Sequence, residues 1–331
     1  MMTENSERFS HIKKAVQAAK DLGITDPAKR REAVINARTA QAYPVKNPIL
    51  KISPEEAIYF PSVAKPDIRN ESDRVIDTAI NKYLIVIEKK KDMPFVPTLV
   101  DAVHDAKPLN KKEGDPGFGE FDEFTGEIAK KVANEVGASL IVAKKSRLIA
   151  DLNRAWWIRQ ERGGVLPKEY SRSARASFYW AVRRILQHSG RLDENEQLKE
   201  KYLRVAVHGM KDHDDFDFAI AGSERPADPE FLDRFFEAFK ASLIEVGLEP
   251  KAVIAVDSDP KTAEYSGPSS IRYFREQPKN DFAKQHPAFG QNFQTIQLEI
   301  GRKMRENPTN RAKVCQAITS TIKRINEPQN N

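Results

Sequence analysis

The chain has 331 residues, of which 40% are hydrophobic and 31% are charged, so it can bury a large core. No apolar run approaches the roughly 18 residues of a membrane-spanning helix, and the polar first ten residues resemble no signal peptide, so we expect a cytoplasmic protein that does not contact a membrane. The net charge of +6 comes from interleaved bases and acids without a long basic block. We therefore expect a small anionic substrate rather than nucleic acid as the partner.

The chain has a single cysteine, Cys315, which excludes an intrachain disulfide and a zinc cluster built from thiolates. It lies among Val314, Ile318 and Ile322 in a helical pattern. Cys315 is therefore predicted to be a small core residue.

The first 70 residues are predicted to form a helical and irregular extension. Apolar residues recur at helical spacing over 10–22, and Asp26-Pro27 begins a second helical stretch that reaches about residue 39. Frequent prolines then interrupt the pattern as far as residue 68. Residues 71–331 are predicted to form the main domain.

The main domain alternates between predicted strands and helices. Helices are expected at 75–80, 122–136, 169–189, from Asp228-Pro229 to Gly247, and at 308–326; strands are expected at 83–87, 95–103, 138–143, 203–208, 217–221, 253–256 and 295–300. Several of these strands are continuous apolar runs, which is typical of strands buried on both faces. The pattern predicts an α/β fold with a mixed, mainly parallel sheet and helices on both faces.

A polar segment, 146–154, follows the apolar strand 138–143 and contains Arg147, Asn153 and Arg154. Ligands bind at the carboxyl ends of strands in such sheets. Arginine forks and an asparagine amide suit a carboxylate or a developing oxyanion. The alternative is that the arginines form surface ion pairs.

Two histidines, His104 and His208, each follow an apolar strand, and Gly209 allows close backbone approach beside the second. A zinc hydrolase needs about three protein ligands and an open position for water. The alternative is that each histidine is a hydrogen-bonded interior residue. His213 lies close to His208 in sequence and is a candidate neighbour of the site.

A carboxylate, Glu299, sits in the apolar run 296–300 and shares one strand face with Gln297. A free charge is costly to bury, so Glu299 is a candidate general base. The alternative is an edge strand with one solvated face.

Several motifs, in order, resemble the N-formylglutamate amidohydrolase family, which is similar to zinc carboxypeptidases, aspartoacylases and poly-γ-glutamate hydrolases. The resemblance covers roughly residues 83–305 and rests on Ser146-Arg147, Asp151-Leu152-Asn153-Arg154, His208-Gly209-Met210, 217–222 and Ile296-Gln297-Leu298-Glu299-Ile300-Gly301-Arg302. The segment 122–129 also resembles the acid-x-x-Thr-x-Glu-Ile-Ala motif of the poly-γ-glutamate hydrolases. The resemblance implies a zinc-carboxypeptidase-like fold with one zinc ion at the carboxyl edge of the sheet.

The resemblance also implies a role for each matched residue. Zinc would be held by His104, Asp122 and His208, with Glu120 as the alternative acid. Glu299 would be the general base, and Arg147 would polarise the scissile carbonyl. The pair Asn153 and Arg154 would grip the α-carboxylate of the substrate.

Two positions depart from the family pattern. The first histidine stands in Val103-His104-Asp105-Ala106 where the family has Pro-His-x-Gly, and Ala206 replaces the acid usually found two residues before the second histidine. These departures bear on metal affinity and histidine orientation.

The expected function is hydrolysis of an amide bond in an N-acyl amino acid with a free carboxylate, such as N-formylglutamate, by a zinc-activated water. The alternatives are a peptidase or γ-glutamyl hydrolase, and a metal-free binding or scaffold protein on the same fold.

Overall fold

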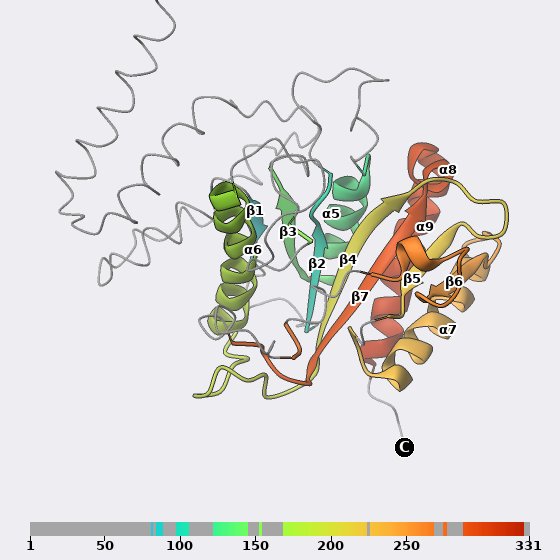
Figure 1. Cartoon of the computed structure of the whole chain (residues 1–331). Coiled ribbons are helices and arrows are strands. Elements are labelled where there is room, and N and C mark those ends of the chain that lie inside the picture. Colours follow the sequence, from blue (N-terminus) through green and yellow to red (C-terminus); the bar gives the residue numbers. More distant parts are fainter. Residues whose placement is uncertain are drawn as a thin grey trace, which may run out of the picture.

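A computed structural model describes residues 81, 84–88, 97–105, 122–144, 152–153, 168–223, 226–267, 274–276 and 287–327 (Figure 1). The expected extension 1–70, the helix at 75–80 and the site candidates Glu120, Arg147 and Arg154 lie outside these residues.

The core of the fold is a mixed sheet in which seven strands follow the order β1-β3-β2-β4-β7-β5-β6. Four neighbouring pairs are parallel, and the pairs β1–β3 and β5–β7 are antiparallel. The predicted mixed, mainly parallel sheet is therefore confirmed. The strands are β1 (Leu84–Ile87), β2 (Thr98–Ala102), β3 (Ser139–Ala143), β4 (Tyr202–Met210), β5 (Phe218–Ala221), β6 (Ala252–Ala255) and β7 (Phe293–Gly301).

Helices cover both faces of the sheet, as predicted (Figure 1). One face packs against α5 (Thr125–Val136), α7 (Pro229–Glu245) and α9 (Pro308–Asn326). The other face packs against α6 (Lys168–His188). Two short elements were not predicted, the 3-10 helix η2 (Ala263–Tyr265) and α8 (Arg302–Glu306). Among the described residues, none of the helices combines the length and the apolar composition that crossing a membrane requires.

The helix α7 shows why these elements form where they do. Its apolar side chains recur at intervals of four and are buried, which places one stripe on the core: Phe231, Phe235, Phe239 and Leu243. Pro229 stands in its first turn, where a missing N–H costs nothing. Asp228 stands at the N-cap, as the sequence predicts, but its side chain makes no capping hydrogen bond, because that carboxylate accepts from Arg275 and Gln294 instead.

The helix α9 has the bounds that the sequence predicts. The side chain of Asn307 accepts hydrogen bonds from the main-chain nitrogens of Thr309 and Asn310, and Pro308 follows the cap. Cys315 lies on the buried side of this helix and is 1% exposed, which confirms its predicted place in the core.

The two central strands, β4 and β7, are longer than predicted and lie side by side in parallel. The strand β4 does not end on His208, because the buried Met210 extends the pairing by two residues. The strand β7 is buried along its whole length between β4 and β5. The interpretation of β7 as an edge strand with a solvated face is therefore wrong. The strand β1, by contrast, is an edge strand whose Val86 and Ile87 are only half-buried.

Candidate metal centre

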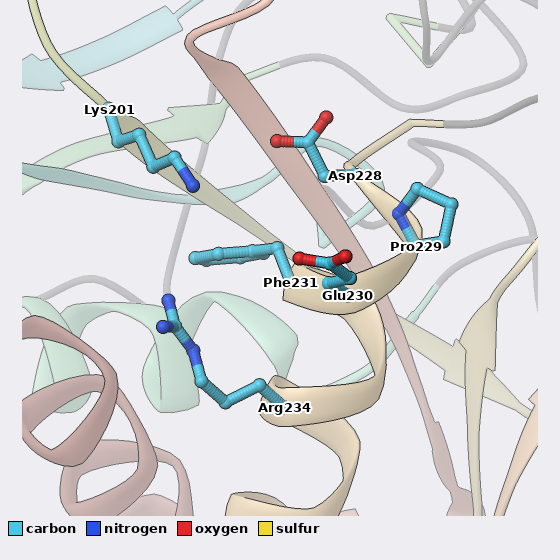
Figure 2. A pocket seen from close by; sticks show the side chains of 6 residues that line it. All are labelled: Lys201, Asp228, Pro229, Glu230, Phe231 and Arg234. Atoms are coloured by element: carbon cyan, nitrogen blue, oxygen red, sulfur yellow. The ribbon is translucent and has the colours of Figure 1, made fainter.

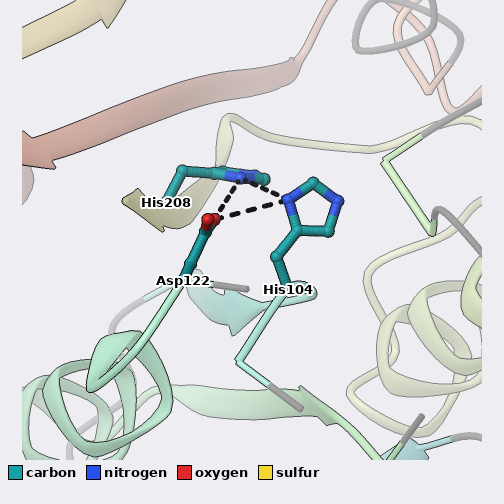
Figure 3. A group of neighbouring side chains, drawn as sticks. All are labelled: His104, Asp122 and His208. Atoms are coloured by element: carbon teal, nitrogen blue, oxygen red, sulfur yellow. Dashed lines mark hydrogen bonds and ion pairs between the residues drawn. The ribbon is translucent and has the colours of Figure 1, made fainter. Parts of the chain in front are cut away.

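Three predicted site residues from distant parts of the sequence converge at the carboxyl edge of the sheet (Figure 3). His104 lies two residues beyond β2, and His208 lies near the end of the adjacent parallel strand β4. Asp122 lies three residues before α5. Because parallel neighbours end at the same edge, β2 and β4 bring their histidines together. Among the described residues this is the one group of three or more possible ligands that meets in this way.

The three side chains form a compact, buried triangle. The Nδ1 atoms of His104 and His208 lie 3.1 Å apart, and the Asp122 Oδ2 lies 3.4 Å from each of them. No side chain of the three is more than 9% exposed.

The size of this triangle fits a zinc ion. Ligands at 2.0–2.1 Å from a tetrahedral zinc are separated from one another by about 3.3 Å, the edge of the tetrahedron. The distances of 3.1 and 3.4 Å bracket that value. The Asp122 contacts, at 3.4 Å, are longer than ordinary N–H···O hydrogen bonds of 2.7–3.2 Å, and this spacing is compatible with a shared ion.

Main-chain hydrogen bonds fix the position of Asp122. Its N–H donates to the His104 carbonyl at 3.1 Å, which ties the two ligand-bearing segments together. Its carbonyl accepts from the N–H and the hydroxyl of Thr125, at 3.2 and 2.7 Å, as α5 begins. The Asp122 main chain is thus occupied by the turn, and its carboxylate faces the histidines (Figure 3).

The electrostatics of the triangle suit a cation. Burial alone would raise the pKa of Asp122, but hydrogen bonds and charge from His104 and His208 hold that pKa below its ordinary value. Burial lowers the pKa of His208, and its hydrogen bond with Asp122 only partly offsets this. Both shifts favour a carboxylate anion and a neutral imidazole, which are the forms that bind a metal ion.

The second nitrogen of His208, Nε2, is buried and has no hydrogen-bond partner among the described residues. A metal-binding histidine usually donates this N–H to a carboxylate or carbonyl. The position two residues earlier is Ala206, where the family that the sequence resembles usually has an acid. The departure seen in the sequence thus coincides with a missing acceptor.

Glu299 lies beside the triangle on β7. Its Cα pairs in register with that of His208 on the parallel neighbour β4, so the two side chains leave the sheet on the same face. Glu299 is 8% exposed. Its Oε1 accepts a hydrogen bond of 2.9 Å from the side-chain amide of Gln297.

Asn153 connects to Glu299 through the same glutamine. The Asn153 Nδ2 donates to the Gln297 Oε1 at 2.9 Å. A buried chain of amides therefore runs from Asn153 through Gln297 to Glu299. The alternating pattern of β7 put Gln297 on the face of Glu299, but nothing in the sequence indicated this connection.

His213 belongs to a different cluster from the one expected. Its ring stacks on Phe216 at 4.4 Å, and its Nε2 lies 2.8 Å from the Tyr265 hydroxyl. Burial raises the pKa of Tyr265, and the charges of Glu264 and Glu299 raise it further. These residues form an aromatic cluster, and only the charge effect on Tyr265 links it to Glu299. Tyr265 is the last residue of η2, an element that the sequence did not predict, and it carried no sequence signal.

A hollow of about 400 Å³ lies at the opposite edge of the sheet (Figure 2). It is lined by Lys201, which precedes β4, and by residues 228–231 and Arg234 at the start of α7. These residues are at the amino end of β4, whereas His208 is near its carboxyl end. The hollow is therefore separate from the candidate metal centre.

The two predicted arginines, Arg147 and Arg154, lie outside the described residues, so their roles remain predictions. Asn153, next to Arg154 in the sequence, is described and is 8% exposed.

Comparison with family models and with curated proteins gives no match. Similar solved structures include an N-formylglutamate amidohydrolase from Ralstonia eutropha JMP134, at 16% identity and a TM-score of 0.48 over 74% of this chain and 97% of that one. They also include a bacteriophage poly-gamma-glutamate hydrolase (15% identity, TM-score 0.35, 73% and 89% covered). A metallo-carboxypeptidase from Burkholderia cenocepacia is similar as well (13% identity, TM-score 0.37, 73% and 60% covered). The kinds of protein that the sequence resembles are thus among these structures.

Proposed function

We propose that the chain is a zinc-dependent amidohydrolase that cleaves the amide bond of an N-acyl or γ-linked amino acid with a free carboxylate. The observation that carries this proposal is the buried triangle of His104, Asp122 and His208 with Glu299 in register beside it. N-formylglutamate is the first candidate substrate because of the sequence resemblance.

The metal would be held by the two Nδ1 atoms and the Asp122 carboxylate. When bound there, zinc supplies Lewis acidity, which polarises a carbonyl and lowers the pKa of water. The low pKa of Asp122 keeps one negative charge in the triangle at neutral pH. The two neutral imidazoles leave part of the positive charge of the ion uncompensated.

Glu299 is the proposed general base. Its carboxylate accepts a proton from the attacking water and gives it to the leaving nitrogen as the C–N bond breaks. The amide of Gln297 holds one carboxylate oxygen and thereby limits the rotation of the side chain.

Substrate binding is assigned to the segment 146–154. We propose that Asn153 and Arg154 grip the α-carboxylate and that Arg147 stabilises the oxyanion that develops on the carbonyl. The hydrogen bond from Asn153 to Gln297 supports this assignment because it ties the segment to the strand of the proposed base.

A substrate panel with controlled metal content tests the proposal. Formyl-, acetyl- and γ-glutamyl-linked glutamate are incubated with the protein after chelation and after zinc is restored. We expect hydrolysis of formylglutamate that is lost with the chelator and recovered with zinc. Hydrolysis of the γ-glutamyl compound alone would favour the γ-glutamyl hydrolase that the segment 122–129 resembles. A zinc-loaded protein that hydrolyses none of the three would contradict the proposal.

A further inference from the structure

A buried arginine, Arg305, contacts the main chain of the segments that carry the candidate metal centre. It belongs to α8, which follows β7, and it is 6% exposed. All three guanidinium nitrogens donate to main-chain carbonyls. Nε donates to Ile300 at 2.9 Å, Nη1 to Glu123 at 2.5 Å and Nη2 to Met210 at 3.2 Å.

Each of these carbonyls belongs to a residue within two positions of a residue of the proposed site. Glu123 follows Asp122, Ile300 follows Glu299, and Met210 comes two residues after His208. The Arg305 side chain therefore joins the segments that carry the two candidate ligands Asp122 and His208 and the proposed base Glu299. In the described part of the protein, Arg305 is the one side chain that donates hydrogen bonds to the main chains of all three segments.

The charge of Arg305 is not balanced by a direct ion pair within the described residues. Burial lowers the pKa of its guanidinium, whereas the charges of Asp122, Glu306 and Glu299 favour its charged form. An apolar side chain of similar volume would fill this space without the cost of burying a charge. The fork of donors, which only arginine has, is what the three carbonyls require.

Gly209 provides the room for the guanidinium. A Cβ at this position would lie 2.6 Å from the Arg305 Cζ and 2.8 Å from its Nε and Nη2. Successive residues of a strand point to opposite faces, so the Gly209 position faces away from the side chain of His208. Arg305 therefore reaches the site only through the main chain.

We infer that Arg305, seated against Gly209, is a positioning residue that sets the spacing of Asp122, His208 and Glu299. This inference rests on the proposed function. Its direct consequence is that Arg305 controls the metal affinity and the coordination geometry without touching the metal or the substrate.

The test compares zinc affinity, measured by competition with a chromophoric chelator, and the visible absorption of the cobalt-loaded protein. The variants are Arg305→Met, which removes all donors, and Arg305→Lys, which keeps the charge but not the fork. The matched control is Arg204→Lys. Arg204 is also buried and lies on β4, but its guanidinium bonds to the Asp101 carboxylate at 2.6 and 3.0 Å.

We expect Arg305→Met to weaken zinc binding by about 10- to 100-fold, the usual effect of removing a residue that orients metal ligands. The cobalt absorption should change as well, and Arg305→Lys should be intermediate. Arg204→Lys should lower the melting temperature but leave the zinc affinity and the cobalt absorption as in the wild type.

The glycine gives an independent test through a double-mutant cycle. In the wild type, Gly209→Ala should weaken zinc binding by displacing the guanidinium. In the Arg305→Ala background, the same substitution should lower the zinc affinity much less. Arg305 and Gly209 variants with lower melting temperatures but wild-type zinc affinity and cobalt absorption would overturn the inference. A wild-type protein that binds no zinc would instead overturn the proposed function, and this inference with it.

Discussion

The carboxylate next to the candidate metal centre, Asp105, gives a quantitative test of the electrostatics around it. Asp105 follows His104, is 3% exposed, and accepts a main-chain hydrogen bond from Gly126. Its Oδ1 has no hydrogen-bond partner among the described residues. Burial raises the pKa of Asp105 from 3.8 to about 6, and the negative charges of Asp122, Glu123 and Glu127 contribute to the rise.

This shift makes the folded protein less stable as the pH rises. Between pH 3.8 and about 6 the folded state binds a proton at Asp105 that the unfolded state has lost, so the free energy of unfolding falls with pH. A rise of about two units corresponds to about 3 kcal/mol, with a slope of at most about 1.4 kcal/mol per pH unit. Asp105→Asn removes this titration.

The assay is urea unfolding of the metal-free wild type and of Asp105→Asn at pH values from 4 to 7.5, with a chelator present. Relative to the wild type, the unfolding free energy of Asp105→Asn should rise by about 2.4 kcal/mol from pH 4 to 7.5, which is most of the full shift of about 3 kcal/mol. This change with pH is independent of any constant cost of burying the new amide. Asp215→Asn is the control, because the hydrogen bond and charge of Lys261 lower the pKa of Asp215 and so place its titration below this pH range. Its difference from the wild type should therefore stay nearly constant from pH 4 to 7.5. Parallel curves for the wild type and Asp105→Asn would refute the reasoning.

Three further predictions follow from the site and the core. Glu299→Gln should keep its zinc and its fold but lose at least about a hundredfold in turnover, measured by steady-state kinetics; wild-type turnover would place the base elsewhere. Arg154→Ala should mainly raise KM, because Arg154 would bind the substrate equally in the ground state and the transition state. Arg147→Ala should mainly lower kcat, because Arg147 would stabilise charge that develops only in the transition state; the reverse pattern would exchange their roles. Burial raises the pKa of Cys315 to about 11, so iodoacetamide should label the native protein at least roughly a hundredfold more slowly than the urea-unfolded chain at pH 8, and rapid native labelling would show that this thiol is accessible.

The sequence predicts the fold where local patterns decide the structure. The bounds of α9 follow from Asn307-Pro308 and an apolar helical stripe, and these signals lie within the helix itself. The burial of Glu299 on both sides could not be predicted in the same way. An alternating strand such as 296–300 is typical of a sheet edge as well, and only the placement of β7 between β4 and β5 decides the matter.

The candidate site was predictable for residues that carry their own chemical signal. His104, Asp122 and His208 stand at the ends of predicted elements, and the structure brings them within 3.4 Å of one another. Arg305 has no such signal, because its contacts are main-chain carbonyls from three distant segments. The partners of the Asp228 side chain could not be predicted for a related reason, since Arg275 and Gln294 reach it only in the folded chain.

The measurement that tests the central claim most directly is zinc stoichiometry after equilibrium dialysis, determined by elemental analysis. The wild type should hold one zinc ion per chain and His208→Ala none. His188→Ala is the control, because His188 is exposed and pairs with Glu88 far from the triangle, and it should hold one. A wild-type protein without stoichiometric zinc, or a His208→Ala protein that retains it in full, would contradict the proposed metal centre.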